Sequence, residues 1–337
     1  MDKWMIDVPV LLLFFTRPEH TKKVFEAIRA AKPSKLYLYQ DGPRLGRTDD
    51  IENIERCRKV VENIDWECKV YRNYQGKNYG CDPSEYLAQK WMFETEEYGI
   101  ILEDDDVPSQ SFFPYCKELL EKYKDDENIQ MVCGYNPIDE YMPCKDDYFF
   151  SKVGSIWGWA TWKRVVDTWD PKYSWMDDPE KQKKYFSSYP TIIERNFLKK
   201  VLKRHRASGI EHYETINSSN MMLYDRLAIN PKYNMISNIG IGGETTHSTN
   251  DIRVLPHATR RLLYKKVYDY TFPLKHPKEI VCCKDFKHQV DKALGHTIPT
   301  YLFNKCSHYV LVLRYKGIKG VKEAVIRKKN KRRAVNK

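Results

Sequence analysis

Four consecutive carboxylates directly follow an apolar run of strand length. The run 98–102 reads YGIIL, and the residues after it are Glu103, Asp104, Asp105 and Asp106. Burying these acids within a strand would cost several kcal/mol each, so we expect them at the strand's carboxyl end, where open α/β sheets bind ligands. Crowded acids repel one another unless a positive charge lies among them, and Mg2+ or Mn2+ suits oxygen ligands. A solvated acidic turn before a helix is the alternative interpretation.

The composition is that of a globular chain. It has 337 residues, of which 42% are hydrophobic, and 24 tyrosines, enough for one large or two ordinary domains with a sizeable core. No apolar stretch reaches the length of a membrane span, so we predict no transmembrane helix. The apolar run 8–15 follows Asp2 and Asp7, and we interpret it as a core strand rather than a signal peptide.

The cysteines indicate the redox compartment of the protein, and the charge distribution indicates which partners it could bind. The nine cysteines form no CxxC pair and no zinc-like spacing, which favours reduced thiols in the cytoplasm. The net charge of +11 is uneven, because the segment 314–337 holds eleven Lys or Arg residues and one acid, Glu323. The rest is nearly neutral, so we do not expect it to bind nucleic acid, whereas the basic tail attracts anions.

Strands and helices alternate through roughly the first 135 residues. We expect strands at 8–15, 35–39, 67–71, 98–102 and 129–133, and helices at 20–31, 51–63, 83–96 and 112–123. This order predicts an α/β fold with a Rossmann-like, mostly parallel sheet flanked by helices. The chain has no GxGxxG and no Gly-Lys-Ser/Thr phosphate loop, which argues against a dehydrogenase or a kinase.

The second half carries an aromatic cluster and a glycine-rich loop. The cluster at 155–162 reads SIWGWATW, and its tryptophans suit either core packing or a platform for a sugar ring. A helix is expected at 213–227 with Glu214 near its start, where the helix dipole favours a carboxylate. Three glycines within 240–243 predict a lid just before His247.

In order and spacing these motifs resemble the GT-A glycosyltransferases, which use sugar nucleotides. The likeness is strongest to bacterial enzymes of cell-surface polysaccharide synthesis and more distant to N-acetylglucosaminyltransferase I. The four acids are similar to the family's Asp-x-Asp motif in its Glu-Asp-Asp form. The other matching segments are Arg17-Pro18, Gln40-Asp41-Gly42, Asn78 to Cys81, Gly158-Trp159, and Asn238 to His247.

The resemblance implies a domain organisation. It implies a GT-A domain over 1–250, with a nucleotide-binding part at about 1–135 and an acceptor part at about 136–250. A C-terminal helical extension with a basic tail is expected over 251–337.

The resemblance also implies binding residues. It places Mn2+ or Mg2+ on Asp105 and His247, and UDP-sugar as the donor. The residues expected to bind this donor are Arg17, Asp41, Asn78, Glu103, Asp104, Gly158 and Trp159. Of these, Asp41 is expected at the uracil edge, Arg17 beside the nucleotide, and Glu103 and Asp104 at the ribose and donor sugar.

The implied reaction transfers a sugar to an acceptor hydroxyl as UDP leaves. The metal neutralises charge on the diphosphate, and a carboxylate takes the hydroxyl proton, from the opposite face of the sugar in an inverting enzyme. The bacterial enzymes carry this acid in a Trp-Asp-Tyr segment, with which Tyr213-Glu214-Thr215 aligns. Glu214 is therefore the expected base and Glu211 its nearest substitute, while Asp178 is the rival if N-acetylglucosaminyltransferase I is the closer parallel.

The C-terminal segment bears on the acceptor and the location. Residues 301–322 mix apolar and basic side chains, which suits either the surface of an anionic membrane or a core helix beside a solvated tail. We expect a cytoplasmic protein that acts on a glycan or a lipid-linked acceptor. If the segment binds a membrane surface, the protein would make peripheral contact with the inner face of the cell membrane.

Two other functions stay open. A catalytically inactive, nucleotide-sugar-binding scaffold of a polysaccharide assembly complex would account for the departure from Trp-Asp-Tyr. A nucleotidyltransferase would share the acidic metal site, but it would need a phosphate loop rich in Gly and Lys near the amino terminus, which Arg17-Pro18 is not.

Overall fold

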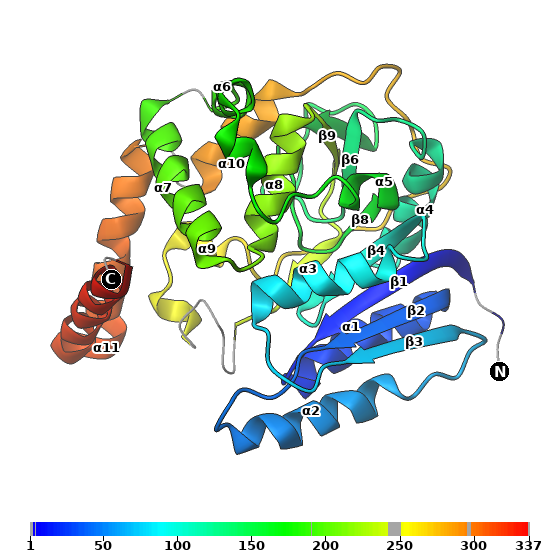
Figure 1. Cartoon of the computed structure of the whole chain (residues 1–337), viewed down its shortest axis with the longest axis horizontal. Helices are drawn as coiled ribbons and strands as arrows, with labels where there is room; N and C mark the ends of the chain where they lie inside the picture. Colours follow the sequence, from blue (N-terminus) through cyan, green and yellow to red (C-terminus); the bar gives the residue numbers. More distant parts are fainter. Residues whose placement is uncertain (1–2, 4, 190, 242–250, 295–297, 336–337) are drawn as a thin grey trace.

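An eight-stranded sheet forms the centre of the molecule (Figure 1). The computed structural model describes residues 3, 5–189, 191–241, 251–294 and 298–335. The strands are β1 (Ile6–Phe14), β2 (Pro33–Gln40), β3 (Lys69–Tyr74), β4 (Tyr98–Glu103), β6 (Ile129–Cys133), β7 (Tyr148–Ser151), β8 (Trp159–Trp162) and β9 (Leu227–Pro231). Their order is β3-β2-β1-β4-β8-β6-β9-β7, and only β8 and β7 run antiparallel to their neighbours. The predicted α/β fold with a mostly parallel sheet is confirmed.

Helices cover both faces of the amino-terminal half. They are α1 (Pro18–Ala31), α2 (Thr48–Val61), α3 (Cys81–Met92) and α4 (Phe112–Lys122). Along β1, Leu12 and Phe14 pack with residues of α1, α2 and α4, whereas Leu11 and Leu13 pack with residues of α3. Because successive strand residues point to opposite faces and both faces are covered, the strand is apolar throughout.

The second half extends the same sheet. Its helices are α5 (Lys163–Val166), η1 (Ser174–Asp177), α6 (Pro179–Ser187), α7 (Ile192–Ser208) and α8 (Tyr213–Leu223). Two short strands, β5 (Asp106–Pro108) and β10 (Ile236–Asn238), form a separate antiparallel pair. Since β6, β8 and β9 lie in one sheet with β1 to β4, the expected nucleotide-binding and acceptor parts share a core.

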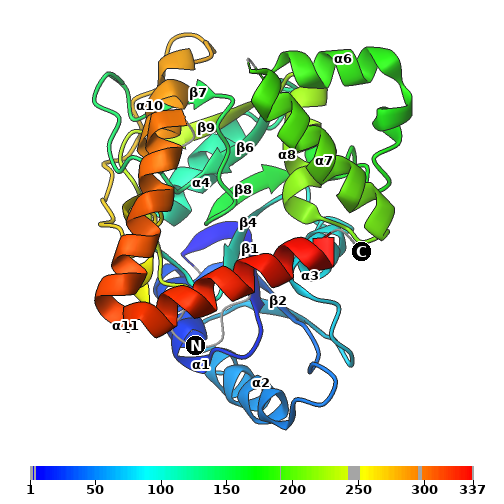
Figure 2. The same cartoon turned by 90° about the vertical axis from the view of Figure 1, so that its left-hand side faces the viewer.

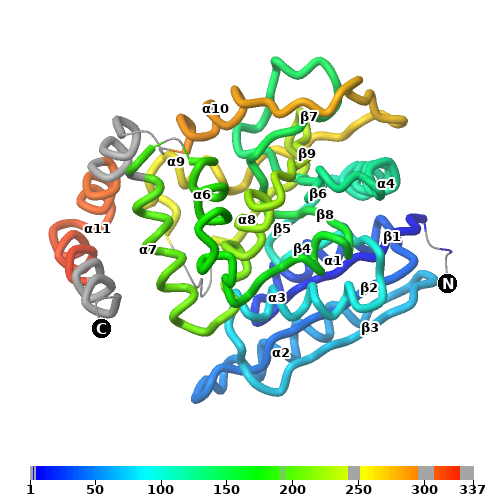
Figure 3. Tube along the Cα trace, turned by 45° about the horizontal axis from the view of Figure 1, so that its top comes forward, coloured from blue at the N-terminus to red at the C-terminus, as the bar shows by residue number. Residues whose placement is uncertain are grey.

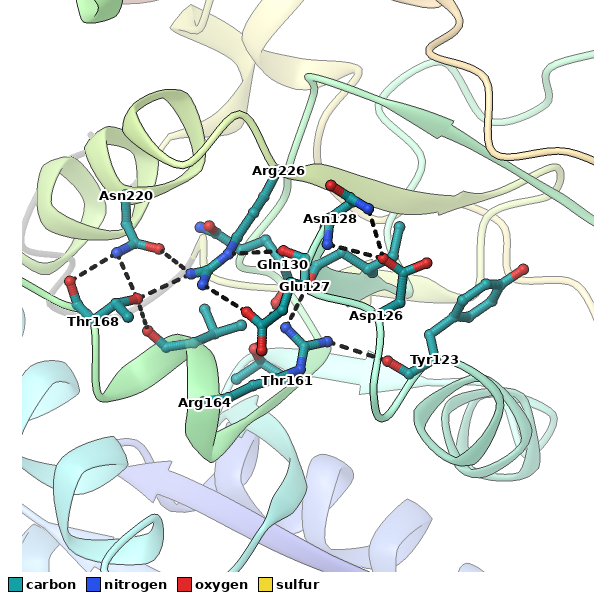
Figure 4. Close-up of polar contacts among 12 residues, drawn as sticks. Tyr123, Asp126, Glu127, Asn128, Gln130, Thr161, Arg164, Thr168, Asn220 and Arg226 are labelled. Carbon is teal, nitrogen blue, oxygen red and sulfur yellow. Dashed lines mark hydrogen bonds and ion pairs between the residues drawn. The ribbon is translucent and has the colours of Figure 1, made fainter. Parts of the chain in front are cut away.

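Two arginines brace this second half (Figure 4). The buried Arg226 donates from Nη1 to Thr168 Oγ1 at 2.9 Å and to Asn220 Oδ1 at 3.0 Å. Arg164 donates to backbone carbonyl oxygens of the turn before β6. Arg226 thus ties the carboxyl end of α8 to Thr168 and to Glu127 in the turn before β6, and α8 is the helix whose first turn carries Glu214.

The C-terminal region consists of short helices and one long, bent helix. Its elements are η2 (Ile252–Val254), α9 (His257–Arg260), α10 (Lys284–Leu294) and α11 (Ile298–Val335). Gly317, with φ 63°, bends α11. The helix contacts η2 and α9 and lies on the side where the chain leaves β2 and β3 for α2 and α3 (Figures 1, 2 and 3). Within the described residues, no helix combines the length and apolarity needed to cross a membrane.

Candidate functional site

The acidic motif, Glu103 to Asp106, lies at the carboxyl edge of the sheet as predicted. Glu103 ends β4, Asp104 and Asp105 form the following turn, and Asp106 begins β5. Yet the motif is not a solvated turn, because Asp104 is 3% exposed, Asp105 8% and Asp106 0%. Burial of this many carboxylates requires compensating partners.

Arg17 supplies the positive charge expected among the acids. It follows β1 and precedes α1, which places its guanidinium beside the end of the neighbouring strand β4. The guanidinium pairs with Asp104 and reaches Asp105 Oδ2 with Nη1 at 2.9 Å. Burial alone would lower the pKa of Arg17, but the charges of Asp104 and Asp105 outweigh it and raise this pKa above its ordinary value.

Asn238, from β10, ties the motif to the second half of the chain. Its Nδ2 donates to Asp105 Oδ1 and to Asp106 Oδ1, both at 3.0 Å. The other oxygen of Asp106 accepts the backbone N–H of Gly158 at 2.9 Å. Gly240 packs so closely that an added Cβ would lie 2.3 Å from Asp105 Oδ2. The segments around Gly158 and Asn238 that the resemblance singled out therefore meet at these carboxylates.

Glu85 is a site residue that the sequence analysis missed. It lies on α3, is 8% exposed, and has a pKa raised by burial and by the charges of Asp106 and Asp105. Burial and the charge of Glu85 likewise raise the pKa of Glu103. The spacing of apolar residues could have revealed that Glu85 is buried, because Ala88, Gln89 and Met92, at i+3, i+4 and i+7, are buried on the same face of α3.

These five carboxylates outnumber their basic partners. Among the residues that the structure describes, Arg17 is the one basic side chain that forms an ion pair with any of them. An excess of buried carboxylate oxygens fits a hard divalent cation such as Mg2+ or Mn2+. Within the described part of the chain, no group of three or more His, Cys, Asp or Glu side chains is arranged to hold a metal ion. Of the two expected metal ligands, Asp105 lies in the cluster, and His247 lies outside the described residues.

Asp41 organises the loop after β3. Its carboxylate accepts the backbone N–H groups of Gly42, Tyr79 and Gly80 and the side-chain Nδ2 of Asn78, at 2.8 to 3.2 Å. Both oxygens are thus engaged within the chain, although burial still raises the Asp41 pKa. Asp41 and Asn78, predicted to bind the donor, are neighbours that shape this loop, and their contact with a nucleotide stays a prediction.

The tryptophans of the 155–162 cluster belong mainly to the core. Trp159 is 1% exposed and its ring lies 6.4 Å from that of Tyr213, so it presents no face to solvent. Trp162 is buried too and donates its indole N–H to Leu120 O at 3.0 Å. Trp157 is half-buried and meets Tyr135 edge-on. Of the two open interpretations, core packing describes Trp159.

Glu214 is the best placed of the three base candidates. It lies exposed in the first turn of α8, beside the buried Tyr213. Burial raises the pKa of Tyr213, and the charges of Glu85, Glu103 and Glu214 add to this effect. Glu211 precedes this helix and is half-buried. Asp178 instead caps α6, accepting the N–H groups of Glu180 and Lys181.

A histidine pair fixes the start of α8. His212 Nδ1 lies 3.0 Å from Asp82 Oδ2 on α3, which links the two helices at the site. The His212 ring stacks on His205, with centroids 3.7 Å apart, and His205 Nδ1 lies 2.9 Å from Thr215 Oγ1. The first turn of α8, with Glu214 on it, is therefore anchored to α3 and to α7.

Comparisons with known proteins return only structural likenesses. No family model and no curated protein matches the chain. A solved UDP-glucose pyrophosphorylase complexed with UDP-glucose is similar over 50% of this chain and 81% of its own, at 9% identity and a TM-score of 0.28. The inositol-1-phosphate CTP transferase from T. maritima is similar over 50% of this chain and 76% of its own, at 12% identity and a TM-score of 0.30. Likenesses this weak support no argument, so the fold rests on the sheet order itself.

Proposed function

We propose that this chain is a divalent-metal-dependent glycosyltransferase. It would move a sugar from a UDP-sugar to a hydroxyl of a glycan or lipid-linked acceptor, with inversion. The observation that carries the proposal is the buried acidic motif at the carboxyl end of β4, paired with Arg17 from the end of β1. In an open α/β sheet this edge is where nucleotides bind.

Asp105 would hold the metal, with His247 as the further protein ligand. When bound, Mn2+ or Mg2+ would neutralise the charge that develops on the departing diphosphate. Arg17, already fixed by Asp104 and Asp105, would lie beside the nucleotide and lend it positive charge. Glu103 and Asp104 would orient the donor sugar and the ribose by accepting hydrogen bonds from their hydroxyls.

Glu214 would act as the base. Its exposed carboxylate lies in the first turn of α8, so an acceptor hydroxyl approaching from solvent could give up its proton there. The anchoring of this turn through His212 and Asp82 would hold the carboxylate in position. Glu211 is the nearest substitute, and the capping role of Asp178 makes it the weaker candidate.

Donor hydrolysis tests the proposal. Purified protein is incubated with Mn2+ and UDP-, GDP- or dTDP-sugars, and the released nucleotide is measured with and without EDTA. We expect metal-dependent UDP release that Asp105→Asn abolishes and that Asp125→Asn, at an exposed aspartate, leaves unchanged. Release of pyrophosphate from UTP and a sugar phosphate would indicate a nucleotidyltransferase. Binding of UDP-sugar without turnover, even with acceptor glycans, would indicate a scaffold.

We further propose that α11 contacts an anionic membrane surface that carries the acceptor. Its exposed side chains include the apolar Val310, Leu313 and Ile318 next to the basic Lys319 and Lys322. This combination suits the interface of an anionic bilayer. In flotation assays we expect binding to vesicles with phosphatidylglycerol, none to phosphatidylcholine alone, and loss of binding in a Lys319→Glu/Lys322→Glu variant. Equal binding to both vesicles would contradict the electrostatic contact.

A further inference from the structure

The C-terminal region adds a third segment to the β5–β10 pair. Two backbone hydrogen bonds of 2.9 Å join this segment to the chain at β10, from Tyr264 N to Asn238 O and from Tyr268 N to Asn234 O. The N–H of Ile239 instead donates to Asp105 O, just before β5, at 2.8 Å. Because the C=O of Asn238 and the N–H of Ile239 belong to one trans peptide group, they point in opposite directions. Residues 264–268, here called the strap, therefore lie along the edge of β10 that faces away from β5.

The side chain of Tyr264 returns to the end of β10. Its Oη donates to Ile241 O at 2.6 Å and lies 3.2 Å from Ile239 O. His20 Nε2, in the first turn of α1, lies 3.1 Å from the same Ile239 oxygen. With its backbone N–H on Asn238 O, Tyr264 thus engages three carbonyl oxygens within residues 238–241.

The stretch that Tyr264 holds surrounds Asp105. The backbone oxygen of Asp105 accepts the N–H of Ile239, and Oδ1 accepts Asn238 Nδ2 at 3.0 Å. The remaining oxygen, Oδ2, would lie 2.3 Å from a Cβ added at Gly240. All three oxygens of Asp105 therefore lie against residues 238–240, so the position of this stretch determines the orientation of the carboxylate.

Tyr264 adopts a backbone conformation that is rare for a bulky residue. Its φ of 51° lies in the left-handed region, which favours glycine and asparagine. The residue is 51% exposed, so little apolar burial offsets the cost of this conformation. Such outliers persist where surrounding contacts hold them, and they gather at functional sites. Here the holding contacts are the hydrogen bonds to residues 238–241.

We propose that Tyr264 is a positioning residue for Asp105. It fixes residues 238–241 from the side of the strap, so that the Asp105 carboxylate keeps the orientation that binds the metal and, with it, the diphosphate of the nucleotide. The inference rests on the proposed function. It goes beyond that function by giving a part in the site to the C-terminal region, which the resemblance placed outside the GT-A domain.

Calorimetric titration of the whole chain with UDP in the presence of Mn2+ tests the proposal. Tyr264→Asn removes the hydroxyl, and asparagine tolerates a positive φ, so this variant should be at least as stable as the wild type. We expect its Kd for UDP with Mn2+ to rise about fivefold, as the loss of one ordinary hydrogen bond would give. Unimpaired stability with weakened binding is a combination that a purely structural role would not produce. Tyr264→Phe, which keeps the ring, should show the same rise in Kd.

Tyr268→Phe is the matched control. Tyr268 lies four positions further along the strap, and its Oη donates to Glu140 Oε1 rather than to residues 238–241. Its loss should leave the Kd for UDP with Mn2+ unchanged. Amide hydrogen exchange adds a measurement that needs no ligand, because in both Tyr264 variants the Ile239 N–H, donated to Asp105 O, should exchange faster than in the wild type.

The outcomes separate this inference from the proposed function. A wild-type chain that binds no UDP in the presence of Mn2+ would overturn the proposed function. A wild-type chain that binds UDP, with a Kd that changes by less than about twofold in both Tyr264 variants, would overturn this inference alone. An equal rise of the Kd in Tyr268→Phe, or unchanged exchange of the Ile239 amide in the Tyr264 variants, would overturn it as well.

Discussion

The Arg17 guanidinium joins the carboxylates of Asp104 and Asp105, with Nη1 2.9 Å from Asp105 Oδ2. One cation from the end of β1 thus neutralises part of the charge at the end of β4. The remaining carboxylates have no basic partner of their own among the described side chains. Binding of a divalent cation by these carboxylates stays a prediction.

Removal of Arg17 should make folding depend on a divalent cation. Without its guanidinium the buried Asp104 and Asp105 repel each other, and we expect Arg17→Met to lower the free energy of unfolding by about 3 kcal/mol. Added Mn2+ should restore part of that loss in urea denaturation. Arg29→Met, which breaks an exposed pair with Asp65, is the control and should change little. An Arg17 variant as stable as the wild type in EDTA would contradict this account.

The sequence predicted the scaffold well because the scaffold follows from local patterns. The strand predicted at 129–133 has the same bounds as β6. The strand predicted at 98–102 ends one residue before β4, which also includes Glu103. Such runs are apolar because both faces of the sheet are covered, and the acids begin where the strand ends, although they stay buried there. The position of the acidic motif was therefore predictable from hydrophobic patterning alone.

The partners of the motif were less predictable, because they come from distant segments. Glu85 lies 18 positions before Glu103 and reaches it only through the packing of α3 on the sheet. Asn238 meets Asp105 because β10 pairs with β5, a register that the sequence does not display. Trp159 was expected to bind the donor, yet the antiparallel insertion of β8 between β4 and β6 buries it.

Gly240→Ala should weaken metal and nucleotide binding with little effect on folding. The new Cβ would lie 2.3 Å from Asp105 Oδ2, so the carboxylate must move from the position set by Arg17 and Asn238. We expect the Kd of UDP with Mn2+ to rise about tenfold. Gly76→Ala, where a Cβ meets no atom within 4 Å, is the matched control. Equal affinities for the two variants would argue against Asp105 as a ligand.

Arg226→Leu should destabilise the second half of the molecule. The side chain is 3% exposed and serves Thr168, Asn220 and Glu127, whose polar atoms would lose their donor (Figure 4). We expect a loss of about 2 to 4 kcal/mol in the free energy of unfolding, measured by urea denaturation. Lys124→Leu, on the exposed part of the neighbouring turn, should stay close to the wild type. A small effect for Arg226→Leu would mean that α8 is held chiefly by its apolar contacts.

The stacked histidines should make stability rise with pH between about 4 and 6.5. Burial and the nearby charge of His212 lower the pKa of His205 to about 4, whereas an unfolded histidine titrates near 6.5. In that window the unfolded chain binds more protons, so acidification favours unfolding, and the effect ends below the folded pKa. His205→Gln should flatten this part of the urea-midpoint profile. Unchanged steepness in the variant would assign the pH dependence to other groups.

Glu214→Gln should abolish transfer while leaving donor and metal binding intact. The substitution keeps the size of the side chain and removes its ability to accept a proton. Loss of a general base lowers kcat by about 10² to 10⁴-fold. Turnover is measured with UDP-sugar, Mn2+ and an acceptor, and Kd for UDP-sugar is measured in parallel. Asp178→Asn is the control, because it alters the cap of α6, and Asn also caps helices, so neither stability nor turnover should change greatly. Near-normal turnover in Glu214→Gln, combined with a large loss of turnover in Glu211→Gln, would identify Glu211 as the base. A large loss in Asp178→Asn alone would instead place the acceptor beside α6.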